Sequence, residues 1–184
     1  MELKTFVFIL ITINEVALFG NLVFTLLYPK YSVVPLPRKK TWQYWFTRIS
    51  TFISTAGIIV LSTLDWNSSF FTHWSRYVLG SILLGIGTVF SVWTVRTITL
   101  HASSGGERGF ITEGPYKYSR NPQYVGDIFT LMGIIVISNS FLVFITGMLG
   151  VVLLVLAPFT EEPWLRRQFP TEYDEYCKNT PRFF

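Results

Sequence analysis

The chain has 184 residues, of which 50% are hydrophobic and only 14% are charged. Soluble domains carry about 25% charged residues, so this composition excludes an ordinary soluble domain and indicates a membrane protein. The net charge is +4, but the basic residues fall in three separate short segments, which argues against a nucleic-acid-binding surface.

Several apolar segments are long enough to cross a bilayer. About 30 Å of hydrocarbon requires about 20 helical residues. Apolar segments near that length lie at residues 5–28, 42–64, 76–100, 122–137 and 141–159. Only residues 138–140 separate the last two, so these should form a tight antiparallel hairpin. We predict an all-α integral membrane protein with about five transmembrane helices. The first is too long for a signal-peptide core, so we expect it to be retained.

The distribution of Lys and Arg predicts the orientation. These residues concentrate in segments 29–41, 101–121 and the tail after Glu162, whereas segments 65–75 and 138–140 contain none. By the positive-inside rule, the three basic segments face the cytoplasm. The N-terminus is therefore expected outside and the C-terminus inside. The loop around Arg120 and the tail after Glu161 would then share one face.

The tail after Glu162 is water-soluble in composition. We expect a short amphipathic helix at the membrane interface, with Trp164, Leu165 and Phe169 towards lipid or core. A second helical turn is predicted to start at Thr171, because Thr-x-x-Asp resembles a capping box. No linker or internal repeat divides the chain, so residues 1–184 are predicted to form one domain.

Segment 114–126 is the densest polar stretch. Asn121 suits an N-cap and Pro122 a first helical residue, so the N–H groups of a helix that begins here can bind a carboxylate. Arg120 adds a planar guanidinium suited to the same group. Tyr116, Tyr118 and Tyr124 offer aromatic faces to a purine or a sulfonium. Gly126 lets a ligand approach the first helical turn closely. The alternative is an ordinary membrane-entry cap with interfacial Arg and Tyr anchors.

Other polar residues allow two interpretations each. Glu161 and Glu162 could bind ribose hydroxyls or an ammonium group, or could complement the following helix N-terminus; neighbours in a helix point about 100° apart. Asp127 could orient a substrate or pair with a neighbour. His101 is a possible proton acceptor. Glu15, deep in the first span, could contact a neighbouring helix or line a substrate pathway.

Some patterns concern packing or are missing. Gly80, Gly85 and Gly87 look like close helix-packing positions. The sequence contains no His/Cys cluster of metal-ligand spacing and no phosphate-binding loop, so no metal is expected.

The order of motifs resembles that of integral-membrane methyltransferases, the isoprenylcysteine carboxyl methyltransferase and phospholipid N-methyltransferase families. The similarity covers roughly the C-terminal 75 residues: Gly114-Pro-Tyr116, Arg120-Asn-Pro122-x-Tyr124-x-Gly126, Glu161-Glu162-x-x-Leu165, Tyr173-x-x-Tyr176 and Pro181-Arg182-Phe183.

The resemblance implies an S-adenosylmethionine site within residues 101–184. The residues expected to contact this cofactor are Gly114, Tyr116, Arg120, Asn121, Pro122, Tyr124, Gly126, Glu161 and Glu162. Arg120, Glu161 and Glu162 are the predicted catalytic residues; an amine acceptor would need a base, for which the two glutamates are the candidates. Arg182 is expected to close the pocket or to meet the acceptor.

The implied function is S-adenosylmethionine-dependent methyl transfer to a lipophilic acceptor at the cytosolic membrane face. Isoprenylcysteine enzymes usually have His where this chain has Asn121, and segment 103–109 lacks a Trp common in that class, so carboxylate and amine acceptors both stay open. The expected partners are the bilayer and a lipid or prenylated acceptor. Two other hypotheses are a sterol-reductase-like enzyme using NADPH and a non-enzymatic membrane scaffold.

Overall fold

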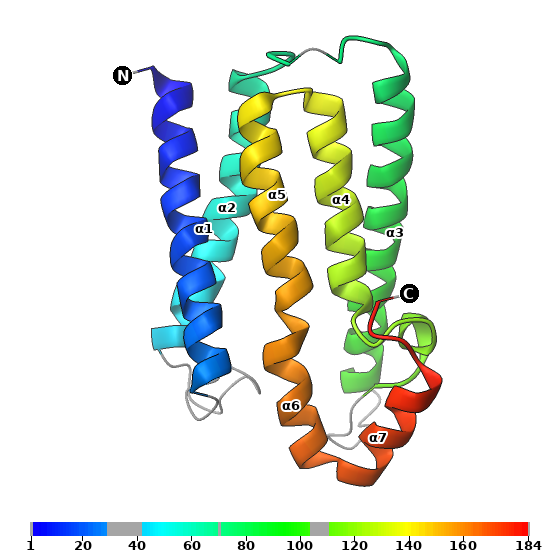
Figure 1. Ribbon diagram of the computed structural model, residues 1–184. Coiled ribbons are helices and arrows are strands. Elements are labelled where there is room, and N and C mark those ends of the chain that lie inside the picture. The colour runs from blue at the N-terminus through cyan, green and yellow to red at the C-terminus, as the bar shows by residue number, and fades with distance from the viewer. Residues whose placement is uncertain (1, 29–41, 70, 104–110, 184) are drawn as a thin grey trace.

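The computed structural model (Figure 1) describes residues 2–28, 42–69, 71–103 and 111–183, apart from the side chains of residues 43 and 101–103. These residues are almost entirely helical and contain no β-strand. The helices, in chain order, are α1 (Leu3–Leu27), α2 (Trp42–Leu64), α3 (Ser75–Ser103), the 3-10 helix η2 (Gly114–Lys117), α4 (Pro122–Ser138), α5 (Phe141–Leu156), α6 (Pro158–Gln168) and α7 (Pro170–Asn179).

Four helical stretches in the described part of the chain are long and apolar enough to cross a membrane. They are Leu3–Leu27, Tyr44–Leu64, Ser75–Leu100 and Phe141–Gln168. With 17 residues, or about 25 Å, α4 is shorter. The all-α membrane class predicted from the sequence is therefore confirmed, whereas the fifth crossing and the orientation stay predictions.

The long helices run alternately up and down (Figure 1). As a result, the start of α1, the α2–α3 loop and the α4–α5 turn lie together at one end, here called the distal end. At the opposite end, the site end, lie η2, α6 and α7. At the distal end Asn67 N–H donates to Ser138 O and Ser69 N–H to Asn139 O, each at 2.9 Å. These bonds fix the short hairpin between α4 and α5 against the loop before α3.

A buried carboxylate strengthens the distal end. Asp65 accepts hydrogen bonds from the hydroxyls of Ser68 and Ser140, both at 2.6 Å, and lies 3.7 Å from Lys4 Nζ. Burial opposes ionisation of Asp65, but these hydrogen bonds and the lysine hold its pKa below the ordinary value. The ionised aspartate therefore links α1, the α2–α3 loop and the start of α5.

Glycines let α3 and α4 touch along their backbones. A Cβ on Gly87 would lie 2.6 Å from Gly126 O, and a Cβ on Gly133 would lie 2.9 Å from Gly80 O. Gly80 and Gly87 are therefore packing positions, as predicted. The same prediction for Gly85 is wrong: a Cβ there meets nothing within 4 Å, because a position two residues from Gly87 points about 200° away from it.

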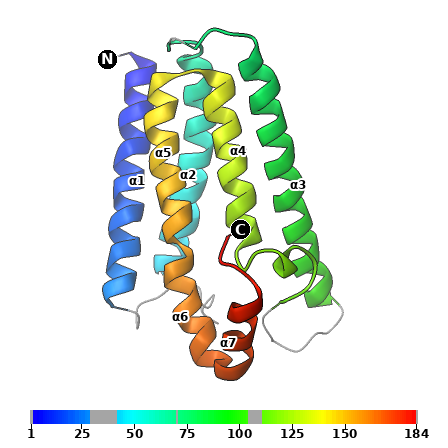
Figure 2. The same ribbon diagram turned by 45° about the vertical axis from the view of Figure 1, so that its right-hand side comes forward.

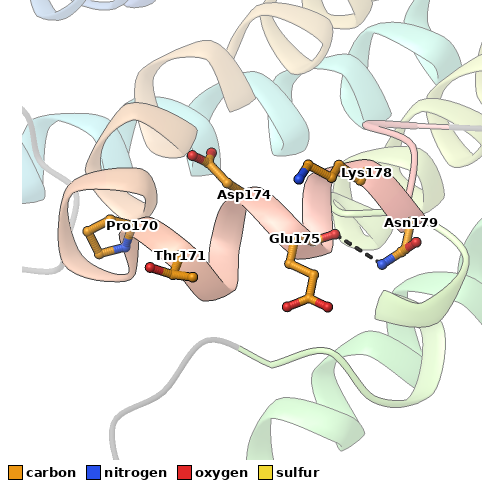
Figure 3. A pocket seen from close by; sticks show the side chains of 6 residues that line it. All are labelled: Pro170, Thr171, Asp174, Glu175, Lys178 and Asn179. Carbon is orange, nitrogen blue, oxygen red and sulfur yellow. Dashed lines mark hydrogen bonds between the residues drawn. The ribbon is translucent and has the colours of Figure 1, made fainter.

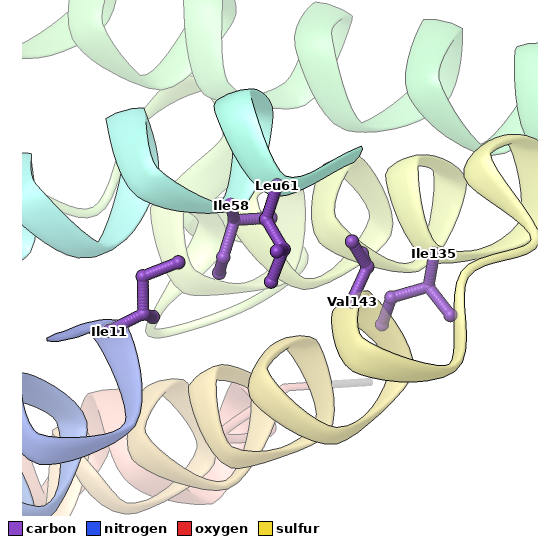
Figure 4. Packing of buried hydrophobic residues seen from close by; sticks show 5 residues of the cluster. All are labelled: Ile11, Ile58, Leu61, Ile135 and Val143. Atoms are coloured by element: carbon purple, nitrogen blue, oxygen red, sulfur yellow. The ribbon is translucent and has the colours of Figure 1, made fainter. Parts of the chain in front are cut away.

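The hydrophobic core lies among α1, α2, α4 and α5. Its buried members, shown in Figure 4, are Ile11, Ile58, Leu61, Ile135 and Val143. Large apolar side chains on the outward helix faces are instead exposed, as expected of surfaces in contact with lipid. Because α4 contacts both this core and α3, it holds the two parts of the bundle together.

The chain after α5 differs in detail from the prediction. The sequence predicts an interfacial helix and then a second helical turn that starts at Thr171. The structure has two consecutive helices here, α6 and α7, and α7 begins one residue earlier, at Pro170. The expected capping box does not form. The side chain of Asp174 instead accepts from Arg166 Nε at 2.7 Å. Proline at the first position of each helix explains these boundaries, because it cannot donate a backbone hydrogen bond there. Trp164, Leu165 and Phe169 are half-buried.

Candidate active site

The loop before α4 positions the first polar groups of the site. Asn121 occupies the N-cap position of α4, but its side chain makes no capping bond. Its Nδ2 instead donates to Glu162 Oε1 and to Arg182 O, both at 3.2 Å. The prediction of the helix start was therefore right, while the asparagine amide is directed towards α6 and the C-terminal tail.

Glu162 is the point at which these segments meet. It is 7% exposed, and Arg182 binds it through two hydrogen bonds, from Nε at 2.9 Å and from NH2 at 2.8 Å. Arg120 NH1 lies 3.6 Å from its Oε2. Paired, forked contacts of this kind are strong and strongly directional. Residues from two segments distant in sequence, the loop before α4 and the C-terminal tail, thus converge on this buried carboxylate of α6.

Glu161 has a different set of contacts. It accepts a hydrogen bond from the hydroxyl of Tyr124, on the first turn of α4. Within the part of the chain that the structure describes, no Lys or Arg forms an ion pair with it. The two neighbouring glutamates therefore contact different residues, as their angular separation predicts, but both face the start of α4.

The C-terminal tail lies across the loop between η2 and α4, as Figures 1 and 2 show. Arg120 N–H donates to Pro181 O at 2.9 Å, and Ser119 Oγ donates to Arg182 O at 3.1 Å. From α7, the hydroxyl of Tyr176 donates to Tyr116 O at 2.6 Å. The tail therefore packs over this side of the candidate site, while the two roles expected for Arg182 stay predictions.

The tyrosines of the site are neutral hydrogen-bond donors at physiological pH. Burial, together with the nearby Glu161, raises the pKa of Tyr116 to about 12. Burial also raises the pKa values of Tyr173 and Tyr176. Their hydroxyls and rings can therefore contact a polar ligand without adding negative charge.

Arg120 has an unused donor. Its NH1 contacts both Glu162 and the Sγ of Cys177, but its Nε is buried with no hydrogen-bond partner among the described residues. A buried donor left unsatisfied costs about 1–3 kcal/mol. An anionic ligand that reached this atom would remove that cost.

The two motif glycines have local structural roles. Gly114 adopts φ +58°, and a Cβ there would lie 2.7 Å from Thr97 Oγ1, so both backbone and space require glycine. Gly126 packs against the backbone of α3. Their contact with a cofactor, which the resemblance implied, stays a prediction.

Asp127 links α4 to α3. Its Oδ1 accepts a hydrogen bond from Ser91 Oγ at 2.9 Å, and the residue is half-buried. The side chain of His101, the other candidate for contact with substrate, lies outside the described residues.

Glu15 is not part of this group. It is 2% exposed, neither carboxylate oxygen has a hydrogen-bond partner among the described residues, and its Oε1 lies 3.6 Å from the point a Cβ on Gly150 would occupy. Gly150 precedes Glu161 by eleven residues, or about 16 Å of helix. The polar contact with a neighbouring helix that was one of the two expectations for Glu15 is made instead by Asn14, which donates to Ser50 O and Ser54 Oγ at 2.8 Å.

A hollow on the outer face of α7 is separate as well. Figure 3 shows it lined by Pro170, Thr171, Asp174, Glu175, Lys178 and Asn179. The inward face of the same helix carries Tyr173, Tyr176 and Cys177, which contact the site.

The sequence did not identify Ser119 or Cys177 as site residues, because neither belongs to a recognisable pattern.

Comparisons with known proteins find a matching family and several relatives. A family model described as phospholipid methyltransferase matches residues 75–172, which is more than half of the chain and includes η2 and most of the site. Phosphatidylethanolamine N-methyltransferase B of Dictyostelium discoideum is 28% identical over 117 residues, covering 60% of this chain and 58% of that protein.

Two bacterial relatives carry other names. The cobalt-zinc-cadmium resistance protein CzcN of Cupriavidus metallidurans is 30% identical over 109 residues, 58% of this chain and 47% of the relative. The nickel-cobalt-cadmium resistance protein NccN of Alcaligenes xylosoxydans xylosoxydans is 25% identical over 143 residues, 74% of this chain and 64% of the relative. The matched part is thus less than two thirds of each curated relative. No solved structure matches the chain.

Proposed function

Because the chain belongs to the phospholipid methyltransferase family, we propose that it transfers the methyl group of S-adenosylmethionine to a lipophilic acceptor at the cytosolic membrane face. The family and the four long apolar helices support a multi-pass membrane methyltransferase. The identity of the donor, the position of its site and the cytosolic face belong to the proposal. The observation that supports them most is the convergence of Arg120, Asn121 and Arg182 on buried Glu162.

The residues of the site fit the functional groups of this cofactor. Its carboxylate matches the unused Nε of Arg120 and the N–H groups at the start of α4. Its ammonium group or ribose hydroxyls match the carboxylate of Glu161. A sulfonium is attracted by aromatic faces such as those of Tyr116 and Tyr124.

The protein contributes by positioning groups and by excluding water. The cofactor, when bound, supplies a methyl group attached to a positively charged sulfur. A nucleophile attacks that methyl carbon in line with the C–S bond and displaces the sulfur. Fixing donor and acceptor in this geometry can contribute about 7–11 kcal/mol to lowering the barrier. The tail bonds of Arg182 and Pro181 close the site against water. Arg120 and Glu162 hold each other in position for the cofactor.

The position of the site suits one soluble and one lipid substrate. It lies at the end of the bundle, where α4 begins, so a cofactor approaches from water and an acyl chain from the bilayer. The basic residues of this end predict that the water is cytosol. The Dictyostelium relative, which is named for methylating phosphatidylethanolamine, supports a phospholipid acceptor.

Cofactor binding by the purified protein in detergent micelles tests the proposal. Wild type should bind S-adenosylmethionine, and Arg120→Ala should weaken binding about 10- to 100-fold, the worth of one charge-assisted hydrogen bond. Arg96→Ala, at an exposed arginine of α3, is the matched control and should bind normally. A wild type that binds NADPH but not S-adenosylmethionine would favour the reductase hypothesis. Binding of neither would leave the proposal wrong.

A further inference from the structure

The carboxylates around the start of α4 differ in their charge partners. Arg120 and Arg182 both contact Glu162. Glu161 and Asp127 have hydroxyl donors instead, from Tyr124 and Ser91. Neither forms an ion pair with any residue that the structure describes. The site therefore holds two acidic side chains that are not paired with a protein cation.

Unmatched carboxylates at a half-buried position favour a cationic ligand. Charges in such surroundings are costly unless paired, and like charges repel strongly where water is scarce. An acceptor that is itself a carboxylate would meet repulsion from Asp127 and Glu161. An acceptor with an ammonium group would be attracted.

Asp127 is placed nearest to the lipid. It lies three residues beyond Tyr124, about 4.5 Å further along α4 into the bundle and therefore towards the bilayer. Its Oδ1 accepts from Ser91 of α3, so Asp127 is held against the neighbouring helix, whereas Glu161 accepts from Tyr124 at the water-facing start of α4. Glu162 is fully engaged by two guanidinium groups, so it is not suited to accept a proton.

We propose that Asp127, held by Ser91, binds the ammonium group of a lipid acceptor and removes its proton before methyl transfer. This inference rests on the proposed function and adds a catalytic residue to it. Glu161 and Glu162, which the sequence suggested as bases, instead serve the cofactor and the tail.

The step balances without any further reactant. One proton passes from the acceptor nitrogen to Asp127, leaving a neutral amine with a lone pair. That pair forms the new N–C bond to the methyl group, while the C–S bond breaks and its electron pair stays on sulfur as a neutral thioether. The methylated product carries the positive charge, and Asp127 releases its proton to water.

A purely structural role must be distinguished, since the bond from Ser91 also joins two helices. Asp127→Asn keeps an oxygen that can accept this bond but removes the negative charge. Ser91→Ala removes the bond but keeps the carboxylate. The two substitutions therefore separate charge from helix contact.

The experiment measures methyl transfer by the full chain in micelles containing dioleoylphosphatidylethanolamine, together with S-adenosylmethionine affinity and thermal unfolding. Asp127→Asn should lower kcat at least about 100-fold, the usual contribution of general base catalysis. Its cofactor affinity and unfolding midpoint should stay close to wild type. Ser91→Ala should unfold at a lower temperature and should lose less kcat than Asp127→Asn, because the carboxylate is kept.

A second acceptor provides a sharper test. A headgroup analogue that ends in an alkoxyamine, whose nitrogen is already neutral at neutral pH, needs no base to free its lone pair. The ratio of wild-type to Asp127→Asn rates should therefore fall towards one with this analogue.

Several outcomes would overturn the inference while leaving the proposed function intact. One is a wild type that binds S-adenosylmethionine but methylates a farnesylcysteine carboxylate rather than the amine, or neither probe. Another is an Asp127→Asn variant with unchanged kcat, or one equally impaired with both amines. A wild type with no affinity for S-adenosylmethionine would instead refute the proposed function itself.

Discussion

At the scale of single residues, Glu162 determines how the site is assembled. It joins Asn121 of the loop, Arg182 of the tail and Arg120 beside α4. Two of these partners are positively charged and largely buried, with 12% of the Arg120 side chain and 33% of the Arg182 side chain exposed. The carboxylate therefore neutralises charges that would otherwise repel each other near the membrane.

Glu162→Gln should destabilise the protein markedly. The amide leaves two guanidinium groups without a counter-charge, and removing one partner of a buried ion pair costs about 3 kcal/mol or more. Thermal unfolding in detergent, followed by circular dichroism, measures the loss. Asp174→Asn breaks the exposed pair with Arg166 and serves as control, and it should change the unfolding midpoint little because exposed ion pairs add little stability. Equal midpoints for the two variants would contradict this role of Glu162.

At this scale the sequence predicted residue types better than their contacts. Asn121 was expected to cap α4, since short amide side chains favour that position. Its side chain instead donates a hydrogen bond to the buried carboxylate of Glu162, forty-one residues later. Such a choice depends on where α6 lies in space, which local sequence preference does not encode.

At the scale of helices, the contact between α3 and α4 positions the site. Glycines bring the two backbones together, and Ser91 and Asp127 add a hydrogen bond at the same interface. The sequence indicated small residues on α3 but not which of them face α4. Several glycines in one helix do not by themselves show which neighbouring helix each of them contacts. The close approach requires small residues on both helices at matching heights.

Gly87→Leu should separate α3 from α4. A Cβ at this position already lies 2.6 Å from the oxygen of Gly126, so a larger side chain must push the helices apart. Overpacking of this kind costs about 1–3 kcal/mol, and methyl transfer should fall because α4, which carries Asp127 and Tyr124, is displaced from its place against α3.

Gly85→Leu is the matched control, because a Cβ there meets nothing within 4 Å. It should leave both the unfolding midpoint in detergent and the rate of methyl transfer unchanged. If the two leucine variants behave alike, the interface described here is not what holds α3 in place.

At the scale of the whole molecule, hydropathy predicted most of the architecture. Apolar segments gave the long helices to within a few residues, and the short turn at residues 138–140 gave the antiparallel hairpin. The path of the chain after Leu156 was predicted less well. There α6 and α7 are polar, and their boundaries depend on prolines and on packing against the site.

The orientation in the membrane makes a separate prediction. In a Cys177→Ser background, Thr72→Cys at the distal end should react with a membrane-impermeant maleimide added to intact cells. Lys178→Cys on α7 should react only after the cells are opened, because the basic segments are expected to stay in the cytoplasm. The reverse pattern would place the site end outside and contradict a cytosolic active site.

The central claim is that η2, the start of α4, α6 and the tail together bind S-adenosylmethionine. Photo-cross-linking of the purified protein with an azido-adenosyl analogue of the cofactor, followed by peptide mapping, tests it most directly. Label should appear in peptides covering residues 111–130 and 158–183 and should disappear when excess S-adenosylmethionine is added. Label confined to α1 and α2, or label that the unmodified cofactor does not displace, would contradict the account.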